Sequence, residues 1–373
     1  RNIPLLVEAT RLNIPVDSEI ALSYAFIKDK NPLLIGITGT DGKSTTAALT
    51  HAFFAEKGKT FLLGNFGEPF INKVEEIKKE DTVILELSSY QLEDGEKYHL
   101  QGATILNLAP DHLNRYQSMD DYRQAKEKIF INQTGQDLVV LNQESPHFLL
   151  WKSLTKAKIK TFSLKESPNK ADFYYSQQKN SLFYTQDNHF IPFLPLSHIQ
   201  LKGSHNLENI MVASAFALHF GVSKEMILNA LNNFTGLEHR CEYLGVKKGV
   251  HFINDSKATT VQAVIKGLSC ASKNLILILG GQDKNLDFSE LNPYLGLHVK
   301  KIICYGETGL KISQALNFKE KEVVYEFDLA FLKATQSAKK GDTILLSPGC
   351  ASFDQFESFE HRGNYFKQLV NAL

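Results

Sequence analysis

The feature that most constrains the fold is the segment 33–46, which reads LLIGITGTDGKSTT. Residues 33–37 predict a buried parallel strand, and Ser44–Lys57, rich in helix formers, predicts a helix. The turn between them carries Gly39 and Gly42, which allow backbone N–H groups to approach an anion closely. Because a helix N-terminus also favours negative charge, this strand, turn and helix predict a nucleotide phosphate site.

Two side chains of the turn suit that chemistry. Lys43 is placed to reach the β- and γ-phosphates of a nucleotide, and the Ser44 hydroxyl is placed to ligate Mg²⁺. The spacing departs from the strict P-loop pattern, because Gly36 lies one residue too far from Gly42. The predicted phosphate-binding residues are Gly39, Thr40, Asp41, Gly42, Lys43, Ser44 and Thr45.

Composition narrows the classes of partner. The chain has 373 residues, enough for two or three domains, and its 41 basic and 41 acidic residues balance. No overall field therefore favours nucleic acid or an anionic membrane, and no apolar run reaches the ~20 residues that span a bilayer. The four cysteines are far apart in sequence, so we predict buried thiols and no disulfide. We expect a cytoplasmic protein that binds small molecules, with no nucleic acid or membrane partner.

The order of predicted elements divides the chain into three parts. Residues 1–30 predict two short helices, over 3–13 and 19–27, which fall short of the ~50 residues of a small domain. We expect them to be the remainder of an N-terminal domain and its linker. Residues 31–237 alternate strands and helices, including a helix over 69–79, and carry an antiparallel ribbon over 161–198.

Residues 238–373 predict a second α/β unit with apolar strands separated by helices. No G-x-G-x-x-G follows its first strand, so the arrangement is Rossmann-like without predicting NAD binding. The fold class is therefore α/β, with a central P-loop-type parallel sheet domain and a C-terminal Rossmann-like domain.

Several polar residues follow predicted strands, at the sheet edge where open α/β folds bind ligands. Glu86 ends one strand and is placed to hold Mg²⁺, and His112 follows another, where a functional and a structural role are equally compatible with the residues. Lys126 lies on a predicted helix and, by composition alone, is a solvated lysine. The loops 280–284 and 347–352 also follow strands and are either ligand loops or ordinary glycine turns.

These motifs together resemble those of the Mur ligases, the ATP-dependent amide-bond-forming enzymes of cell-wall synthesis, over essentially the whole chain. The resemblance rests on GTDGKST at 39–45, ELSSYQL at 86–92, Asp111-His112, residues 122–126, residues 203–209, His239-Arg240, INDSKAT at 253–259, LSPGCASFDQFESF at 346–359, and Arg362-Gly363-Asn364. Asp41 stands where the family usually has Asn, and Gly349 where Ala is usual. The last four stretches are similar to members that add D-glutamate to UDP-N-acetylmuramoyl-L-alanine through an acyl phosphate, usually as monomers.

The resemblance implies roles for residues around the phosphates. Lys43 and the loop amides would bind ATP, and Ser44 and Glu86 would hold one of two Mg²⁺ ions. His112 would be a ligand of the second Mg²⁺. Lys126 would be carbamylated by CO₂ and would position that metal, which differs from the role that composition alone suggests. The implied catalytic residues are Lys43, Asn65, His112 and Lys126.

The resemblance also implies how the substrates are held. Asn65 would meet the UDP substrate near the reacting centre, and residues 1–30 would be what remains of the N-terminal UDP-substrate domain. The adenine, phosphates and ribose of ATP would contact Asn209, Arg240 and Asp255, respectively. Thr259 and Lys284 would bind the α-carboxylate of D-glutamate, with Ser352 and Phe359 around its side-chain carboxylate.

Two other functions remain open at this point. One is a different ligase of the same superfamily, either another muramyl ligase or a folate polyglutamate ligase, against which the INDSKAT and LSPGCAS stretches argue. The other is a regulatory protein that binds ATP without ligation. A protein that only binds ATP for regulation has no need of the loops around Lys284 and Ser352, so we favour the enzyme.

Overall fold

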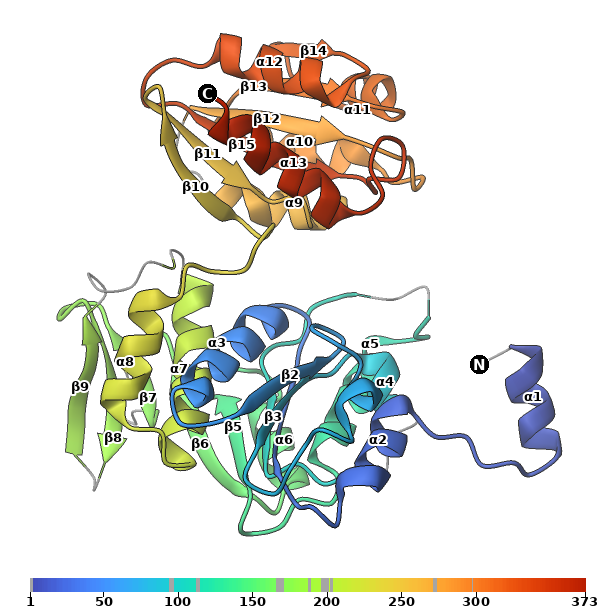
Figure 1. Ribbon diagram of the computed structural model, residues 1–373, viewed down its shortest axis with the longest axis vertical. Coiled ribbons are helices and arrows are strands. Elements are labelled where there is room, and N and C mark those ends of the chain that lie inside the picture. The colour runs from blue at the N-terminus through green and yellow to red at the C-terminus, as the bar shows by residue number, and fades with distance from the viewer. Residues whose placement is uncertain are drawn as a thin grey trace. The chain divides into compact units, whose positions relative to one another are not determined.

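The computed structural model describes residues 3–93, 97–111, 115–165, 171–186, 189–195, 201, 204–270, 274–296 and 298–373, apart from the side chain of residue 269. The chain divides into two compact units, residues 1–234 and 235–373 (Figure 1). Each unit is built on its own mixed sheet and is described by itself. In the described part of the chain, no helix combines the length and the apolar character needed to cross a membrane.

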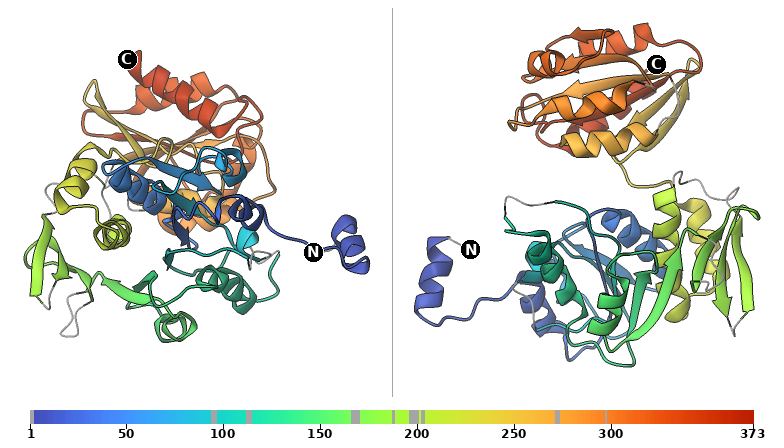
Figure 2. Two further views of the ribbon diagram at one scale, coloured as in Figure 1. Left: turned by 60° about the horizontal axis from the view of Figure 1, so that its bottom comes forward. Right: turned by 180° about the vertical axis from the view of Figure 1, so that it is seen from behind.

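The sheet of the first unit has the order β2-β3-β1-β4-β5-β6-β7-β8-β9. Neighbours are parallel from β2 to β7, and β8 and β9 continue the sheet as antiparallel strands at one edge (Figures 1 and 2). The strands are β1 (Leu33–Thr38), β2 (Thr60–Gly64), β3 (Thr82–Glu86), β4 (Gly102–Ile105), β5 (Leu138–Asn142), β6 (Lys158–Ser163), β7 (Phe173–Ser176), β8 (Ser181–Gln186) and β9 (His189–Pro195). The antiparallel edge agrees with the ribbon predicted over 161–198.

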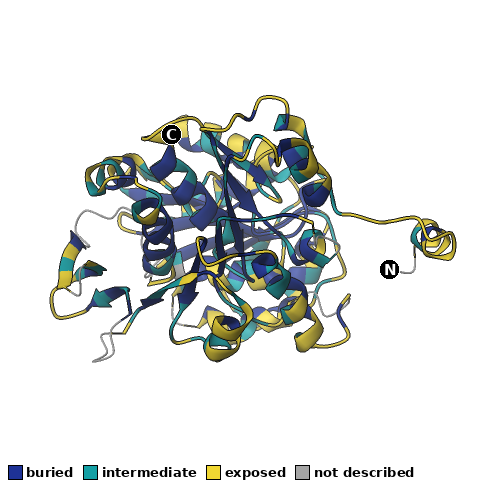
Figure 3. Cartoon of the chain, turned by 90° about the horizontal axis from the view of Figure 1, so that it is seen from below, coloured by how far each residue is buried: buried dark blue, intermediate teal, exposed yellow. Residues whose placement is uncertain are grey.

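Helices cover both faces of this sheet, because successive strand residues point to opposite sides. In β5, Leu138 and Val140 face α3, α7 and α8, whereas Val139 and Leu141 face α2, α4 and α6. The helices are α1 (Pro4–Arg11), α2 (Glu19–Ile27), α3 (Lys43–Ala55), α4 (Ser89–Glu93), α5 (Met119–Glu127), α6 (Phe148–Leu154), α7 (Ser204–His219), α8 (Lys224–Asn233), and the 3₁₀ turns η1 (Phe70–Lys73) and η2 (Lys128–Phe130). Figure 3 shows the buried strands between helices whose outer sides are exposed.

The segment before β1 contributes to this unit through α2. Ser18 caps that helix by accepting a hydrogen bond from the Ala21 N–H, at 3.2 Å. Glu19 accepts a hydrogen bond from the Ile71 N–H at 2.7 Å, which ties α2 to η1. By contrast, α1 is exposed along most of its length, with only Ala9 buried (Figure 3).

The second unit has the sheet order β10-β11-β15-β12-β13-β14, with only the β10–β11 pair antiparallel among its described pairs. Its strands are β10 (Glu242–Lys247), β11 (Val250–Asn254), β12 (Leu275–Gly280), β13 (Val299–Tyr305), β14 (Lys321–Val323) and β15 (Thr343–Gly349). Its helices are α9 (Val261–Gly267), α10 (Asn292–Leu295), α11 (Gly309–Ala315), α12 (Phe327–Ser337), α13 (Phe359–Asn371), and the turns η4 (Leu268–Cys270) and η5 (Phe288–Leu291). Apolar residues of α9, α10 and α11 cover one face, and those of α12 and α13 cover the other.

The helix predicted over 69–79 is wrong. Only the short turn η1 forms there, preceded by Pro69, and the chain continues in turns. Phe70, Val74 and Ile77 are buried and have helix-like spacing, which explains the misleading pattern. The Asp81 carboxylate accepts a hydrogen bond from the Lys78 N–H at 2.9 Å, so the backbone bends toward β3 and does not continue a helix.

Candidate nucleotide and amino-acid sites

The predicted phosphate turn lies between β1 and α3, at the carboxyl edge of the parallel strands. Gly39 and Gly42 have φ angles of 149° and 80°, which L side chains rarely adopt. A Cβ on Gly42 would also lie only 2.6 Å from the Asn209 Oδ1 atom. The turn therefore requires glycine at both positions, and the first turn of α3 begins directly after it.

The turn is held in shape by the end of the neighbouring strand β4. Asn107 Oδ1 accepts a hydrogen bond from the Asp41 N–H at 2.8 Å, and its Nδ2 donates to the Asp41 carbonyl at 3.2 Å. The Asn107 carbonyl accepts from the Thr40 N–H at 3.1 Å. The Thr40 hydroxyl bonds to both backbone groups of Ala109. Sequence reasoning missed Asn107, whose position at a strand end was the available signal.

Two lysines direct their ammonium groups at carbonyls of this turn. Lys43 Nζ donates to the carbonyls of Gly39 at 3.0 Å and Thr40 at 2.7 Å. Lys126 Nζ donates to the same Gly39 carbonyl at 2.9 Å and to the Thr38 hydroxyl at 3.2 Å. The turn thus gathers the amine groups of two lysines beside backbone amides, and Lys43 is placed to supply the positive charge that a polyphosphate site requires.

Lys126 is not a solvated lysine, because its residue is only 1% exposed. Burial, with a further contribution from the positive charge of Lys43, lowers the pKa of Lys126 to about 7. Its Nζ also lies 4.8 Å from the centre of the Tyr122 ring. A large fraction of Lys126 is therefore a neutral, nucleophilic amine near neutral pH. The role suggested by composition alone was wrong, because composition does not report burial.

Glu86, at the end of β3, is the best candidate metal ligand among the described residues. It is 2% exposed, and its Oε1 accepts a hydrogen bond from Asn65 Nδ2 at 2.7 Å. Its Oε2 is buried and has no hydrogen-bond partner in the described structure. A buried carboxylate oxygen without a donor suits a divalent cation, and the buried Ser44 at the start of α3 adds a hydroxyl. These residues fit Mg²⁺.

The described residues contain no group of three or more His, Cys, Asp or Glu side chains that could hold a metal by itself. Mg²⁺ usually takes one or two protein ligands and completes its shell with phosphates and water, so two ligands suffice for the first ion. His112, predicted to bind the second ion, lies outside the described residues.

A cavity of about 210 Å³ brings together three of the predicted residues. It is lined by Lys43, Asn65, Ser88, Ser89, Tyr90, Tyr122 and Lys126. Sequence reasoning assigned no role to Ser88, Ser89 or Tyr90, although they lie within a stretch that carried the family resemblance. Asn209 is 4% exposed, and its Oδ1 accepts a hydrogen bond from the Thr46 hydroxyl at 3.0 Å. It therefore packs α7 against α3, and its contact with adenine stays a prediction.

The predicted residues of the second unit follow the carboxyl ends of β11, β12 and β15, except Arg240, which precedes β10. Asp255 and Ser352 are buried, Thr259 and Phe359 are half-buried, and Lys284 and Arg240 are exposed. The loops after β12 and β15 meet where the Gln282 N–H donates to the Ala351 carbonyl at 2.9 Å. Because these strands are parallel, their ends place all three loops along the same edge of the sheet.

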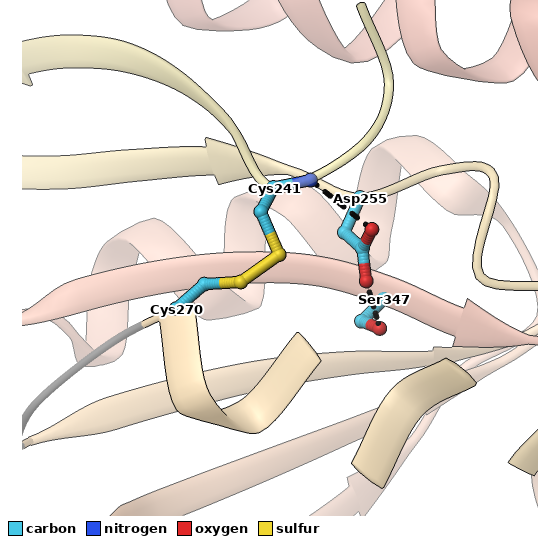
Figure 4. Close-up of a disulfide and its surroundings, with 4 residues drawn as sticks. All are labelled: Cys241, Asp255, Cys270 and Ser347. Carbon is cyan, nitrogen blue, oxygen red and sulfur yellow. Dashed lines mark hydrogen bonds between the residues drawn. A yellow bond between two sulfur atoms is a disulfide. The ribbon is translucent and has the colours of Figure 1, made fainter. Parts of the chain in front are cut away.

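Asp255 is buried beside a disulfide (Figure 4). Its carboxylate accepts hydrogen bonds from the Ser347 hydroxyl at 2.8 Å and from the Cys241 N–H at 3.1 Å. Burial raises the pKa of Asp255 to about 7, against the opposing effects of these two donors. A Cβ on Gly267 would lie 2.5 Å from Oδ2, so glycine is needed for α9 to approach this carboxylate.

The prediction that no cysteine pairs is wrong for two of the four. Cys241 and Cys270 form a disulfide; their positions differ by 29 in the sequence, and their Cα atoms lie 6.1 Å apart (Figure 4). Cys241 precedes β10 and Cys270 ends η4, and only the tertiary structure brings these ends together. Cys304 and Cys350 are buried free thiols, as predicted.

We expect reduction of this disulfide to lower the free energy of unfolding by roughly 2–4 kcal/mol, because the unfolded chain regains loop freedom. The measurement is urea unfolding with and without dithiothreitol. The control is the double variant C241S/C270S, which keeps Cys304 and Cys350 and should not respond to the reductant. Four free thiols in the untreated, denatured protein would contradict the disulfide.

With the geometry established, comparisons with known proteins identify the family. Residues 37–217 match the Mur ligase middle domain, and residues 239–350 match the Mur ligase glutamate ligase domain. A ligase from Alkaliphilus metalliredigens named UDP-N-acetylmuramoylalanine–D-glutamate ligase is 39% identical over 377 residues, covering 100% of this chain and 81% of the relative. This chain belongs to the Mur ligase family.

Further relatives and structures agree with that assignment. The enzyme of the same name from Elusimicrobium minutum is 39% identical, covering 100% of this Mur ligase and 83% of the relative. The fold is similar to that of MurC from Thermotoga maritima, with a TM-score of 0.67, 19% identity and coverage of 99% of this chain and 82% of that one. MurF from the same organism, in complex with ADP, has a TM-score of 0.65 at 15% identity and covers 95% and 84% of the two chains.

Membership has direct consequences for this Mur ligase. It is an ATP-dependent ligase of peptidoglycan precursor synthesis, and the family implies ATP and Mg²⁺. The α/β fold predicted from the sequence, with a P-loop-type sheet followed by a C-terminal α/β unit, is confirmed. FolC of E. coli, in complex with DHPP and ADP, shares the fold with a TM-score of 0.68 at 16% identity, covering 96% of this chain and 94% of that one. Similarity of fold therefore does not distinguish among substrates.

Proposed function

We propose that this Mur ligase adds D-glutamate to UDP-N-acetylmuramoyl-L-alanine, with hydrolysis of ATP to ADP and phosphate. The observation that carries the proposal is the 39% identity to relatives of that name, which extends over the whole of this chain and over 81% and 83% of the relatives. The phosphate turn, held in shape by hydrogen bonds with Asn107, and the separate loops of the second unit support it. The domain division at 1–30, 31–237 and 238–373, the monomeric state and the cytoplasmic location stay predictions.

The reaction needs an activated carboxylate, because a carboxylate does not condense with an amine at neutral pH. The substrate carboxylate attacks the γ-phosphorus of ATP, giving an acyl phosphate and ADP, and the amine of D-glutamate then displaces phosphate. Lys43 and the amides of the turn would bind the β- and γ-phosphates and stabilise charge on the transferred group. Bound Mg²⁺ would neutralise phosphate charge, held by Ser44 and Glu86.

We propose that Lys126 acts as a carbamate. Its neutral amine attacks CO₂, forming an N–C bond and releasing one proton, and the product is an anion at a site that held a neutral amine. The burial of Lys126 and its lowered pKa support this reaction, because only the neutral amine attacks CO₂. The carbamate oxygens, with His112, would hold the second Mg²⁺. Asn65, which already orients Glu86, would meet the UDP substrate.

The remaining predicted roles stay proposals. Lys284 and Thr259 would bind the α-carboxylate of D-glutamate, with Ser352 and Phe359 near its side-chain carboxylate. Asn209, Arg240 and Asp255 would contact the adenine, phosphates and ribose of ATP. Asp255 already accepts two hydrogen bonds, so a ribose hydroxyl would have to add a third donor to its carboxylate.

The deciding experiment is ATP-dependent phosphate release with UDP-N-acetylmuramoyl-L-alanine and a panel of D- and L-amino acids. Release that requires D-glutamate, with formation of the expected amide detected by mass spectrometry, supports the proposal. Release with another amino acid would assign this ligase to a different step of the family. ATP binding without release under any condition would favour a regulatory protein.

A further inference from the structure

The most unusual buried charge of the second unit is the guanidinium of Arg362, on α13. The residue is 0% exposed, and its guanidinium donates five hydrogen bonds. Nε donates to the Ser256 hydroxyl at 3.0 Å. Nη2 donates to the carbonyls of Ser256 at 2.9 Å and Cys350 at 3.2 Å. Nη1 donates to the Ala351 carbonyl at 3.2 Å and to the Tyr305 hydroxyl at 3.3 Å. The sequence analysis gave this arginine no role of its own.

Most of the groups that accept these hydrogen bonds belong to the loops that carry the residues proposed to bind the amino-acid substrate. Ser256 begins the stretch that contains Thr259, and Cys350 and Ala351 directly precede Ser352. The Ser256 hydroxyl donates in turn to the Phe359 carbonyl at 2.8 Å. The Ala351 carbonyl also accepts from the Gln282 N–H, which links the loop of Lys284 to the same point. One planar group therefore sets the spacing of three loops.

The charge of Arg362 is not cancelled by a contact ion pair. All five acceptors are neutral oxygens, and the described residues place no carboxylate oxygen within 4.0 Å of the guanidinium nitrogens. Asp354, which follows Ser352 in the same loop, interacts with this charge at longer range: burial raises the pKa of its carboxyl, whereas the positive charge of Arg362 acts to lower it. Burying an unpaired charge is costly, and a neutral hydrogen-bonding residue could fill a purely structural position at lower cost. This positive charge lies beside the segment that leads into Ser352, because the Cys350 and Ala351 carbonyls accept hydrogen bonds from it.

The orientation of the peptide unit between Ala351 and Ser352 indicates a function for the charge of Arg362. The Ala351 carbonyl is turned toward Arg362 and Gln282. In a trans peptide the following N–H points the opposite way, and the described residues include no cis peptide bond. The Ser352 N–H is therefore directed away from Arg362, and the described part of the chain provides no acceptor for it. Such a buried donor requires an acceptor from elsewhere.

We propose that Arg362 is a positioning residue that makes the amino-acid site selective for a side-chain carboxylate. Its guanidinium holds the Ser256 and Cys350–Ala351 segments together from behind, orients the Ser352 N–H toward the substrate, and supplies positive charge under that carboxylate. Arg362 itself does not touch the amino acid. This inference rests on the proposed function and adds to it the group that specifies an acidic substrate.

The test separates the amino-acid step from the earlier phosphoryl transfer. Wild type, R362K and R362Q are assayed for phosphate release with D-glutamate, and with hydroxylamine in its place, which traps the acyl phosphate without using the amino-acid site. We expect R362Q to raise the KM for D-glutamate by ~10–100-fold, because small displacements of positioning groups have effects of that size. Hydroxylamine-dependent release should stay within about twofold of wild type, since all five hydrogen bonds of the Arg362 guanidinium are made within the second unit and the phosphate turn belongs to the first.

Two further measurements distinguish a positioning role of Arg362 from a general loss of structure in its variants. R362K keeps the charge but loses the forked geometry, so its KM should lie between those of wild type and R362Q. The preference of wild type for D-glutamate over D-glutamine, as the ratio of dissociation constants, should fall in R362Q. K333Q, which removes one positive charge from α12 at the surface of the same unit, is the matched control and should behave as wild type.

A wild-type KM for D-glutamate in R362Q, or equal losses with D-glutamate and hydroxylamine, would overturn the proposal. If R362Q does not fold, S256A makes a smaller change in the same network, and an unchanged KM in both S256A and R362K would overturn it. If wild type responds to a different acidic amino acid, only the proposed function fails, and the same variants assayed with that amino acid decide on Arg362. A response to neutral amino acids alone would overturn both.

Discussion

Replacement of Lys43 by Met is expected to lower kcat/KM for ATP by at least ~10²–10³-fold, the size of effect found when one preorganised donor to a transition-state charge is removed. In the free protein, Lys43 Nζ is held by two carbonyls of its own turn, at 3.0 and 2.7 Å. Phosphate oxygens would replace those neutral acceptors with charged ones, and the charge-assisted bonds are stronger. Methionine keeps an unbranched side chain of similar size and removes the ammonium group with its charge and hydrogen-bond donors.

The measurement is phosphate release as a function of ATP concentration, together with thermal unfolding to verify the fold. K57M is the matched control, because Lys57 follows the same helix, is exposed, and donates to the Phe220 carbonyl at 2.7 Å, away from the turn. We expect it to retain wild-type kinetics. Equal kinetics for K43M and wild type would show that the turn does not bind the transferred phosphate.

The second large effect is expected at Lys126. Met in its place should lower kcat by ~10²–10³-fold, because the carbamate that we propose would be lost with its negative charge. In wild type, removal of CO₂ should lower activity and bicarbonate should restore it, whereas K126M should not respond. Activity should also fall as pH drops below about 7, since the amine then protonates and no longer takes up CO₂. Isotope-labelled bicarbonate followed by NMR detects the carbamate directly.

Stability provides an independent readout at the same residue. In CO₂-free protein, burial lowers the pKa of Lys126 to about 7 from the ordinary value of 10.5. Between these two pH values the unfolded chain binds more protons than the folded one, so the free energy of unfolding rises with pH across this window. We therefore expect K126M to be more stable than CO₂-free wild type, with a larger difference at pH 7 than at pH 10. A pH-independent difference would contradict the lowered pKa.

Local signals in the sequence were sufficient for much of the architecture. The apolar run before Gly39 and the helix formers after Gly42 predicted β1 and α3, and α2 occupies the predicted 19–27. Strand ends also indicated where ligands bind, because parallel strands bring their carboxyl ends to one edge. Glu86 was found in this way, whereas the role predicted for Asp255 came from the family resemblance. These features depend on neighbours within a few residues, or on a rule that holds for all parallel sheets.

The misses have a common physical origin. The spacing of Phe70, Val74 and Ile77 resembled a helix, but Pro69 and the Asp81 carboxylate favour turns there. Cys241 and Cys270 were too far apart in sequence for their pairing to be visible. Arg362 looked like one more residue of a motif until its five hydrogen bonds showed which loops it joins.

The sequence by itself thus determined the order of the elements, the position of the phosphate turn and the family. Only the tertiary structure decided the chemical state of the groups at that turn. Lys126 becomes a neutral nucleophile because packing excludes water from its amine, and Glu86 keeps a buried oxygen without a donor because Asn65 occupies the other. Burial and charge proximity are set by residues distant in the chain, so no local pattern of amino acids can encode them visibly.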